Sequence, residues 1–184
     1  MRKETERQAF HLVFGTLLAV LIAVLGRFCS LALFGSALVA GVLISELLQK
    51  KFRIQPFYWF IRRLERRGVK PGQGTLNFVL GSFIALVFFD SRIVFVSVLI
   101  LAFADSFSTI VGRGFGKKKV INKKSLEGFA AGFLASFLVT LPYLNVHIGL
   151  VVCFVAALIE LLTPVDDNIV IPPLASLIIY MLTL

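Results

Sequence analysis

Acidic side chains inside apolar stretches are the residues of this sequence best suited to do chemistry. Asp105 lies in the segment ADSFSTIVG, within an otherwise apolar run. Helical spacing places Ser108 and Thr109 on the same face as Asp105. A carboxylate inside a membrane span must pair, take up a proton or bind a cation. Mg²⁺ prefers hard oxygen ligands, often carboxylates plus substrate phosphates, so we predict a magnesium site here; the alternative is a structural hydrogen bond between helices.

A stretch rich in glycine and lysine follows directly and is suited to bind phosphate. Glycines let backbone N–H groups approach phosphate oxygens, and lysines supply point charges. Ser125 is suited to cap the next helix, whose first N–H groups are free donors, and Glu127 would ligate a metal or favour the helix dipole. The stretch is not a Walker loop, and basic inner loops are routine in membrane proteins. The candidate nucleotide-binding residues are Gly112, Arg113, Gly116, Lys117, Lys123, Lys124, Ser125 and Gly128.

A polar cluster near the N-terminus has helical spacing. Glu4, Arg7 and His11 are three and four residues apart, which puts them on one helical face. Arg7 and His11 are suited to hold a phosphate or headgroup, and His11 is also suited to move protons. The alternative for His11 is an ordinary hydrogen bond at the membrane boundary.

A fourth polar cluster lies near the C-terminus. Glu160 precedes Asp166, Asp167 and Asn168 by six to eight residues. A buried glutamate near a helix end, together with carboxylates and an amide in a tight turn, is suited to complete a cation site. Asp and Asn are also ordinary turn and capping residues, which is the alternative for residues 166–168.

The elements that must position these residues are apolar helices. Hydrophobic residue types make up 58% of the 184 residues, more than the roughly 45–50% of soluble domains. We predict one all-α domain over residues 1–184, a polytopic helix bundle in the membrane. A spanning helix needs roughly 20 mostly apolar residues. The predicted spans are 8–26, 30–48, 74–90, 92–112, 127–144, 146–163 and 169–184, with turns at 142–147 and 164–168 and with Pro172 and Pro173 in the first turn of the last helix.

The distribution of charge predicts the orientation. The net charge is +9, and with a cytoplasmic N-terminus the inner segments contain 17 of the 19 Lys and Arg, leaving only Arg27 and Arg92 outside. In a soluble protein this excess of positive charge would suggest a nucleic-acid partner. Here the basic inner loops explain the excess, and we expect no nucleic-acid partner.

The expected location is the cell membrane, which the chain would cross several times. We expect the active site on the cytoplasmic face and a first helix that is retained rather than cleaved.

The inner segment 49–73 is more than a linker. Within 57–67, Phe57, Phe60, Ile61 and Leu64 recur at helical spacing and arginines occupy the other side. This pattern predicts an amphipathic helix lying in the membrane interface. Such a helix is either a surface anchor or a guide for a lipid substrate.

The ordered set of motifs resembles the family of CTP-dependent lipid alcohol kinases, which includes dolichol kinase, phytol kinase and the CTP-dependent diacylglycerol kinase. The features that carry the resemblance are His11 and Gly15, the 74–89 helix after a basic amphipathic loop, Asp105 leading to Gly112 and Gly116, the stretch KKSLEG from Lys123 to Gly128, and Glu160 with Asp167, Asn168 and Pro172.

The resemblance implies transfer of the γ-phosphoryl group of CTP to a lipid hydroxyl, with Mg²⁺ as cofactor. The lipid would be a polyprenol or dolichol, or alternatively diacylglycerol or phytol. The roles implied are Mg²⁺ binding by Asp105, Glu127, Asp167 and Asn168; triphosphate binding by Arg113, Lys117, Lys123 and Lys124; and backbone approach at Gly112 and Gly116. The catalytic residues would be Asp105, Asp167 and His11, with Asp105 or Asp167 accepting the proton, and Arg7 and Glu160 would be further polar residues of the site.

Two other functions share part of the pattern. Phosphatidate cytidylyltransferases resemble the chain from Asp105 to Gly128, but their C-terminal signature is missing here. A transporter or non-catalytic membrane protein would use Asp105 and Glu160 for ion coupling, although no inverted repeat is visible. The residues leave the lipid, the choice of CTP over another nucleotide and the oligomeric state open.

Overall fold

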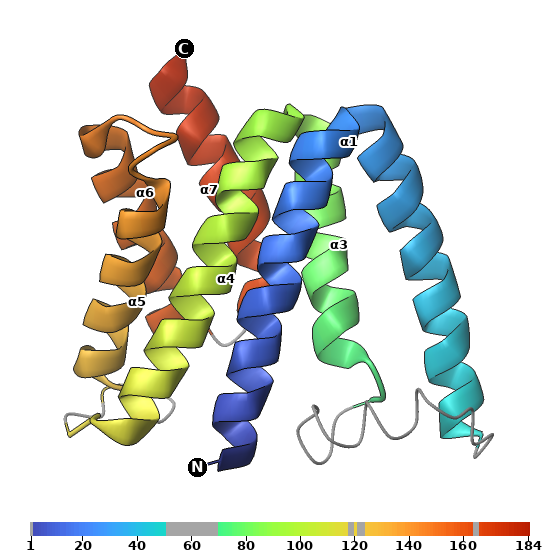
Figure 1. The fold of residues 1–184 in the computed structure, drawn as a ribbon, viewed down its shortest axis with the longest axis horizontal. Coiled ribbons are helices and arrows are strands. Elements are labelled where there is room, and N and C mark those ends of the chain that lie inside the picture. Colours follow the sequence, from blue (N-terminus) through green and yellow to red (C-terminus); the bar gives the residue numbers. More distant parts are fainter. Residues whose placement is uncertain (1, 51–69, 118–119, 121–123, 164–165) are drawn as a thin grey trace.

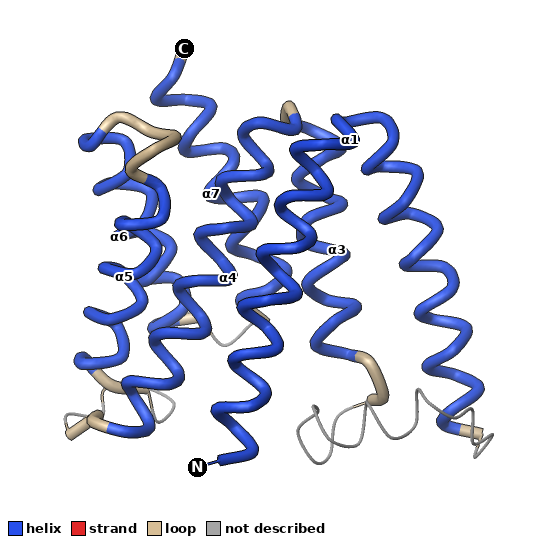
Figure 2. The backbone as a smooth tube through the Cα atoms, in the orientation of Figure 1, coloured by secondary structure: helices blue, strands red, loops and turns tan. Residues whose placement is uncertain are grey.

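The computed structural model describes residues 2–50, 70–117, 120, 124–163 and 166–184. Within these ranges the chain is all-α, as predicted, and contains no strand (Figures 1 and 2). The predicted interfacial helix 57–67 and Lys123 lie outside the described residues. The helices are α1 (Arg2–Gln49), α3 (Gln73–Phe88), α4 (Ser91–Gly114), α5 (Leu126–Thr140), α6 (Val146–Leu162) and α7 (Asp167–Thr183).

Helix α1 combines two of the predicted segments. At Gly26 the backbone adopts φ 72° and ψ 179°, a conformation open mainly to glycine, and the chain reverses there. Figure 1 shows the resulting two arms running in opposite directions. Arg27 donates to the carbonyls of Leu86 (2.9 Å) and Val87 (2.6 Å). These are among the last carbonyls of α3, so the arginine ties the bend of α1 to the end of α3.

Helix α4 is the centre of the bundle. It lies between α1 and α5 in Figure 1 and also contacts α3, α6 and α7. Val94, Val98, Ile100, Leu101 and Ala102 are completely buried. In the lower half of α4, Asp105, Ser106 and Ser108 are also buried, so these polar side chains face other helices.

Helices α4 and α5 pack closely through small residues. A Cβ atom on Gly128 would lie 2.7 Å from the backbone oxygen of Ser108, and one on Gly132 would lie 2.8 Å from that of Ala104. Such spacing of small residues lets two helix backbones approach each other in a membrane. The contact holds the start of α5 beside the last two turns of α4.

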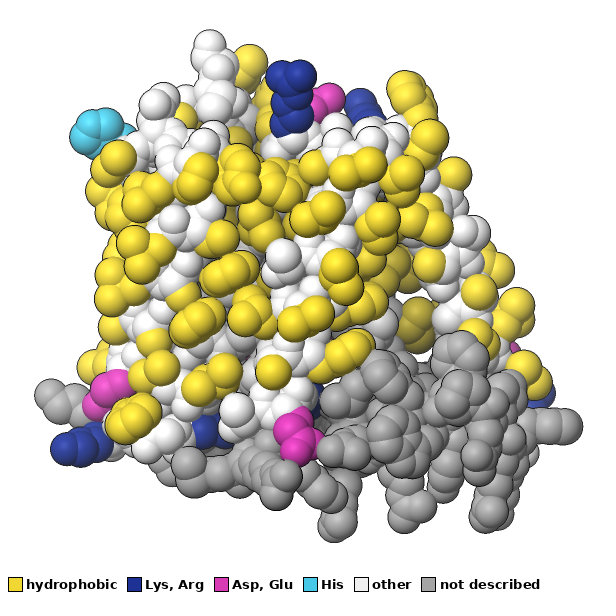
Figure 3. Space-filling model, in the orientation of Figure 1, with side chains coloured by type: hydrophobic (Ala, Val, Ile, Leu, Met, Phe, Trp, Pro, Cys, Tyr) yellow, Lys and Arg dark blue, Asp and Glu magenta, His cyan; other side chains and the backbone are white. Residues whose placement is uncertain are grey.

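The outer surface of the bundle is apolar. Figure 3 shows hydrophobic side chains spread across the height of the helices on the visible face. Two described helical segments, Glu4–Gln49 and Ser91–Gly114, are long and apolar enough to cross a membrane; α3, α5, α6 and α7 are apolar but shorter, with 15–17 residues.

The start of α7 differs from the prediction. The helix begins at Asp167 rather than near residue 169, so Pro172 and Pro173 lie inside it, beyond its first turn. Proline has no N–H, and therefore the carbonyls of Asn168 and Ile169 receive no helical hydrogen bond from those positions. The early start is favoured by Asp166, whose side chain caps α7 by accepting from the N–H of Asn168.

Candidate functional site

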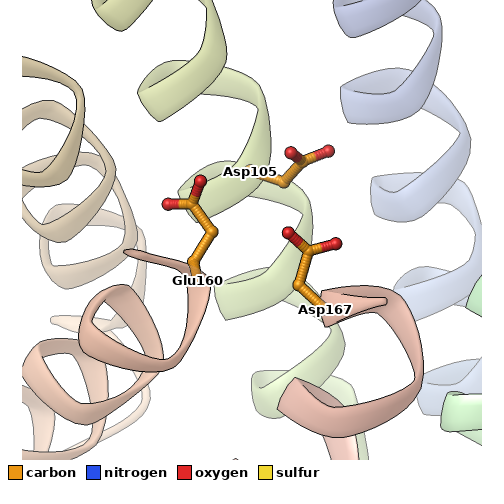
Figure 4. Close-up of side chains that lie close together, drawn as sticks. All are labelled: Asp105, Glu160 and Asp167. Carbon is orange, nitrogen blue, oxygen red and sulfur yellow. The ribbon is translucent and has the colours of Figure 1, made fainter. Parts of the chain in front are cut away.

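Three carboxylates from three helices meet at one end of the bundle. Asp105 comes from the lower half of α4, Glu160 from the last turn of α6 and Asp167 from the first residue of α7 (Figure 4). Each offers an oxygen, and these oxygens lie within 4.8 Å of one another. Asp105 and Glu160 are 8% and 4% exposed. Hard oxygen ligands at this spacing suit Mg²⁺ or another divalent cation.

Hydroxyl groups on α4 hold two of the carboxylates in place. Ser108 donates to Oε1 of Glu160 (2.8 Å), and Thr109 donates to Oδ1 of Asp105 (3.3 Å). The predicted shared face of Asp105, Ser108 and Thr109 is confirmed. The hydrogen bond from Ser108 also joins α4 to α6.

Lys124 supplies a positive charge to the group. Its Nζ lies 3.5 Å from Oε1 of Glu160 and 3.5 Å from Oδ2 of Asp167, and it donates to the backbone oxygen of Glu160. The ammonium group therefore contacts two of the three carboxylates, and its single charge does not balance all three when they are ionised. A further cation would balance the remaining charge in this largely buried place.

The N-terminal cluster divides between two places. Nε2 of His11 lies 3.3 Å from Oδ2 of Asp105 and is buried without a properly aligned hydrogen bond among the described residues. Arg7 instead pairs with Glu4 at 2.5 Å, and Glu4 also lies 3.3 Å from Arg113 near the end of α4. His11 thus joins the carboxylate group, whereas Arg7 forms part of a separate ion-pair cluster between α1 and α4.

An amide cluster at the start of α7 adds a residue that the sequence reasoning missed. Asn77 on α3 donates to Oδ2 of Asp166 (2.6 Å), and Nδ2 of Asn168 donates to Oδ1 of Asp166 (2.8 Å). Oδ1 of Asn168 is buried and has no hydrogen-bond partner among the described residues. The signal for Asn77 was an amide inside the apolar 74–90 segment, but nothing in the local pattern indicated its partner.

The glycine-rich stretch packs against itself and α5. Ser125 caps α5 as predicted, because its hydroxyl accepts from the N–H of Gly128 (3.1 Å). A Cβ on Gly112 would lie 3.0 Å from the Ser125 hydroxyl, and one on Gly116 would collide with it. These glycines therefore allow the turn after α4 to fold onto the start of α5, and Lys117 lies exposed beside them.

The positions of Glu160 and Glu127 differ. Glu160, which the local pattern suited to complete a cation site, is one of the three clustered carboxylates, whereas Glu127, given as a metal ligand by the family resemblance, is not a member of that group. Glu127 is half-buried in the first turn of α5, where a carboxylate favours the helix dipole. Its role as a metal ligand stays a prediction.

Two known proteins are similar to this chain. An uncharacterized protein of Methanocaldococcus jannaschii is 32% identical over 182 residues, which cover 96% of this chain and 93% of that protein. The CTP-dependent diacylglycerol kinase 1 of Schizosaccharomyces pombe is 26% identical over 130 residues, covering 59% of this chain and 60% of the kinase.

No established family profile matches the chain, and no solved structure matches it. The similarity to the kinase is distant and covers only part of both proteins. The similarity to the archaeal protein runs through nearly the whole of both chains. This chain therefore belongs to the same protein family as the uncharacterized M. jannaschii protein.

Proposed function

We propose that this chain is a membrane-embedded kinase that transfers the γ-phosphoryl group of CTP to the hydroxyl of a lipid alcohol. The observation that carries the proposal is the buried group of Asp105, Glu160 and Asp167, with Lys124 beside it. The partial similarity to a CTP-dependent diacylglycerol kinase supports the choice of nucleotide and substrate class. Phosphoryl transfer needs positioning and charge neutralisation more than covalent chemistry, and this site offers both.

The proposed membrane arrangement has seven spans, with the two arms of α1 as the first two and the N-terminus in the cytoplasm. The start of α1, the end of α4, the start of α5, the end of α6 and the start of α7 lie at the same end of the bundle in Figure 1. The positive-inside rule assigns that end to the cytoplasm, because the basic inner segments belong to it. The carboxylate group would then face cytoplasmic CTP from just inside the cell membrane.

The carboxylates and Asn168 would hold the metal. When bound, Mg²⁺ would neutralise charge on the triphosphate. Asp105, Glu160 and Asp167 supply oxygens from three helices, and the unpartnered Oδ1 of Asn168 fits a neutral ligand. Glu127 is a further candidate from the start of α5.

The basic residues would hold the triphosphate. The ammonium group of Lys124 lies beside the carboxylates and its side chain is partly exposed, so it would contact phosphate oxygens as well. Arg113 and Lys117 lie exposed at the same end of the bundle. We assign the same role to Lys123, from its place in the sequence motif.

The transfer itself requires one proton acceptor. The bond between the γ-phosphorus and its bridging oxygen breaks, CDP leaves, and the lipid oxygen bonds to the phosphorus as its proton departs. Asp105 or Asp167 would accept that proton. His11, 3.3 Å from Asp105, is placed to receive it from Asp105 and pass it on.

The lipid hydroxyl would approach at the cytoplasmic interface with its chain between the helices, and Arg7 lies near that level on α1. Polyprenol or dolichol is the first substrate to test, followed by diacylglycerol and phytol. Each has an apolar chain that suits the apolar bundle surface, so the assay must separate them.

The test is a panel of nucleotides and lipids with purified protein in detergent or vesicles. CTP labelled at the γ-phosphate, with Mg²⁺ and each lipid, should yield a labelled lipid monophosphate and CDP. Release of pyrophosphate with a CDP-lipid product would instead identify a cytidylyltransferase. If neither product forms with any isoprenoid or glycerolipid alcohol, with CTP or ATP, the kinase proposal is wrong.

A further inference from the structure

Asp166 is the best satisfied carboxylate near the site. Its Oδ2 accepts from the side-chain amide of Asn77 at 2.6 Å. Its Oδ1 accepts from the side-chain amide of Asn168 at 2.8 Å and from the backbone N–H of Asn168 at 3.1 Å. Both oxygens are therefore engaged by neutral donors, and Asp166 does not belong to the group of three carboxylates close enough to share a cation.

The bonds to Asp166 fix the orientation of the Asn168 side chain. An ionised carboxylate only accepts hydrogen bonds, so the NH₂ end of Asn168 must face Asp166. The carbonyl end, Oδ1, then points away from Asp166. That oxygen is buried without a hydrogen-bond partner among the described residues, and buried acceptors are normally paired. An oxygen kept free in this way, on the residue after Asp167, fits a ligand to a cation.

Helix α3 holds the start of α7 in place. A Cβ atom on Gly81 would collide with the backbone oxygen of Asn168 and approach the Cα of Ile169 within 3.0 Å. The lack of an N–H on Pro172 leaves that backbone oxygen without its usual helical donor. Asn77 lies one turn before Gly81 on α3, so the two residues contact the same end of α7 from the same helix.

We infer that Asn77 and Asp166 are positioning residues that orient Oδ1 of Asn168 toward the metal bound by Asp105, Glu160 and Asp167. The inference rests on the metal site of the proposed function, and it assigns Asp166 a role other than ligand. Residues that orient a metal ligand are typically needed for tight binding even though they do not touch the ion.

The test measures Mn²⁺ binding by electron paramagnetic resonance, with the full chain in detergent and without nucleotide or lipid. Asn77→Ala should weaken Mn²⁺ binding by about tenfold to a hundredfold. Asp166→Asn should weaken it at least as much, because an amide at position 166 can turn a donor toward Asn168 and reverse its side chain. Asn145→Ala, at the other end of the bundle and without a capping bond in the structure, is the matched control and should bind like the parent.

Asn77→Ala tests whether the hydrogen bond to Asp166 matters to the metal site at all. Mn²⁺ affinity that is unchanged or tighter in this variant would overturn the inference. Asn77→His, whose ring N–H can still donate to Asp166, should recover part of the affinity and shows that loss of binding is not loss of folding. An unchanged thermal unfolding midpoint without metal gives the same check for each variant.

The two proposals fail in different ways. Normal lipid phosphorylation with Mn²⁺ binding insensitive to Asn77 and Asp166 would leave the kinase proposal standing and overturn this inference. Mn²⁺ binding that depends on Asn77, without any lipid product, would support the positioning role and contradict the kinase. A parent protein that binds no Mn²⁺ would overturn the inference and the metal part of the proposed function together.

Discussion

Each end of α4 has an aspartate, and the surroundings of the two differ. Asp90 precedes the first turn, is exposed, and accepts from the backbone N–H of Arg92 at 2.9 Å. Asp105 is buried two turns before the other end, beside Glu160, Asp167 and His11. The charge of Asp90 is satisfied by its own helix. That of Asp105 is placed beside other carboxylates, an arrangement that a shared cation would stabilise.

The same contrast extends across the bundle. At the Asp90 end, Arg27 donates hydrogen bonds to two of the last carbonyls of α3. In the buried part of the same half of the bundle, the hydroxyl groups of Ser97 and Ser176 hydrogen-bond each other at 2.7 Å. Among the described residues, the buried polar atoms without partners lie mostly at the Asp105 end, in Gln8, His11 and Asn168, with Ser30 near the bend of α1 as the exception. The Asp90 end therefore uses most of its polar groups to close helices, whereas the Asp105 end keeps several available for a ligand.

Replacement of the two aspartates tests the comparison most strongly. Asp105→Asn should lower the rate of lipid phosphorylation by about a hundredfold to a thousandfold, the range seen when one transition-state electrostatic contact is lost. Asp90→Asn should leave the rate unchanged, because asparagine also caps a helix. Initial rates at saturating CTP and lipid give the measurement. Equal rates for both variants would remove Asp105 from the chemistry.

Removal of the ammonium group tests the charge balance at the site. Lys124→Met should destabilise the metal-free protein by about 1–3 kcal/mol, below the range for fully buried pairs because the lysine is partly exposed. Mg²⁺ should then raise the thermal unfolding midpoint of Lys124→Met more than that of the parent. Lys70→Met, at an exposed lysine, is the control. The same Mg²⁺ effect in all three proteins would contradict this charge compensation.

Glycine replacement tests how tightly each end is packed. Gly128→Ala should cost about 1–3 kcal/mol, because the added Cβ would lie 2.7 Å from the backbone oxygen of Ser108. Gly149→Ala, near the opposite end, meets nothing closer than 3.4 Å and should be neutral or stabilising by up to about 1 kcal/mol. Denaturant unfolding in detergent compares the two. A harmless Gly128→Ala would show that α4 and α5 separate more easily than the structure indicates.

The smallest effect is expected at the bend of α1. Arg27→Met removes the donors to Leu86 and Val87 and should lower stability by about 1 kcal/mol with little effect on kinase activity. Arg92→Met, at an exposed arginine of the same end, should change neither quantity. A large loss of activity in Arg27→Met would mean that the bend is coupled to the site, and the separation of the two ends would then be wrong.

Much of the local structure could be predicted because it depends on residues close in the chain. Apolar length placed the helices within a few residues, and the polar spacing around Asp105 identified one face of α4. Ser125 was recognisable as a cap because the capping contact joins residues three positions apart. The start of α7 was misplaced because Asp166 caps it before the apolar run begins.

Contacts between distant helices could not be predicted in the same way. Asn77 and Asp166 are 89 residues apart and meet only because α3 packs closely on the start of α7. The glycines after Asp105 read as phosphate-binding residues, yet the structure also gives them the close contact between α4 and α5. Spacing along one helix carries no information on which residue of another helix it will face.

The sequence by itself determined that this protein is a bundle of apolar helices with its basic residues gathered in a few connecting segments, because hydrophobicity and charge act locally and additively. The tertiary structure decided that Glu160, rather than Glu127, joins Asp105 and Asp167. It also decided that His11 approaches Asp105 while Arg7 pairs elsewhere. Those choices depend on how helices cross and how closely their backbones approach, which the packing of the whole bundle sets.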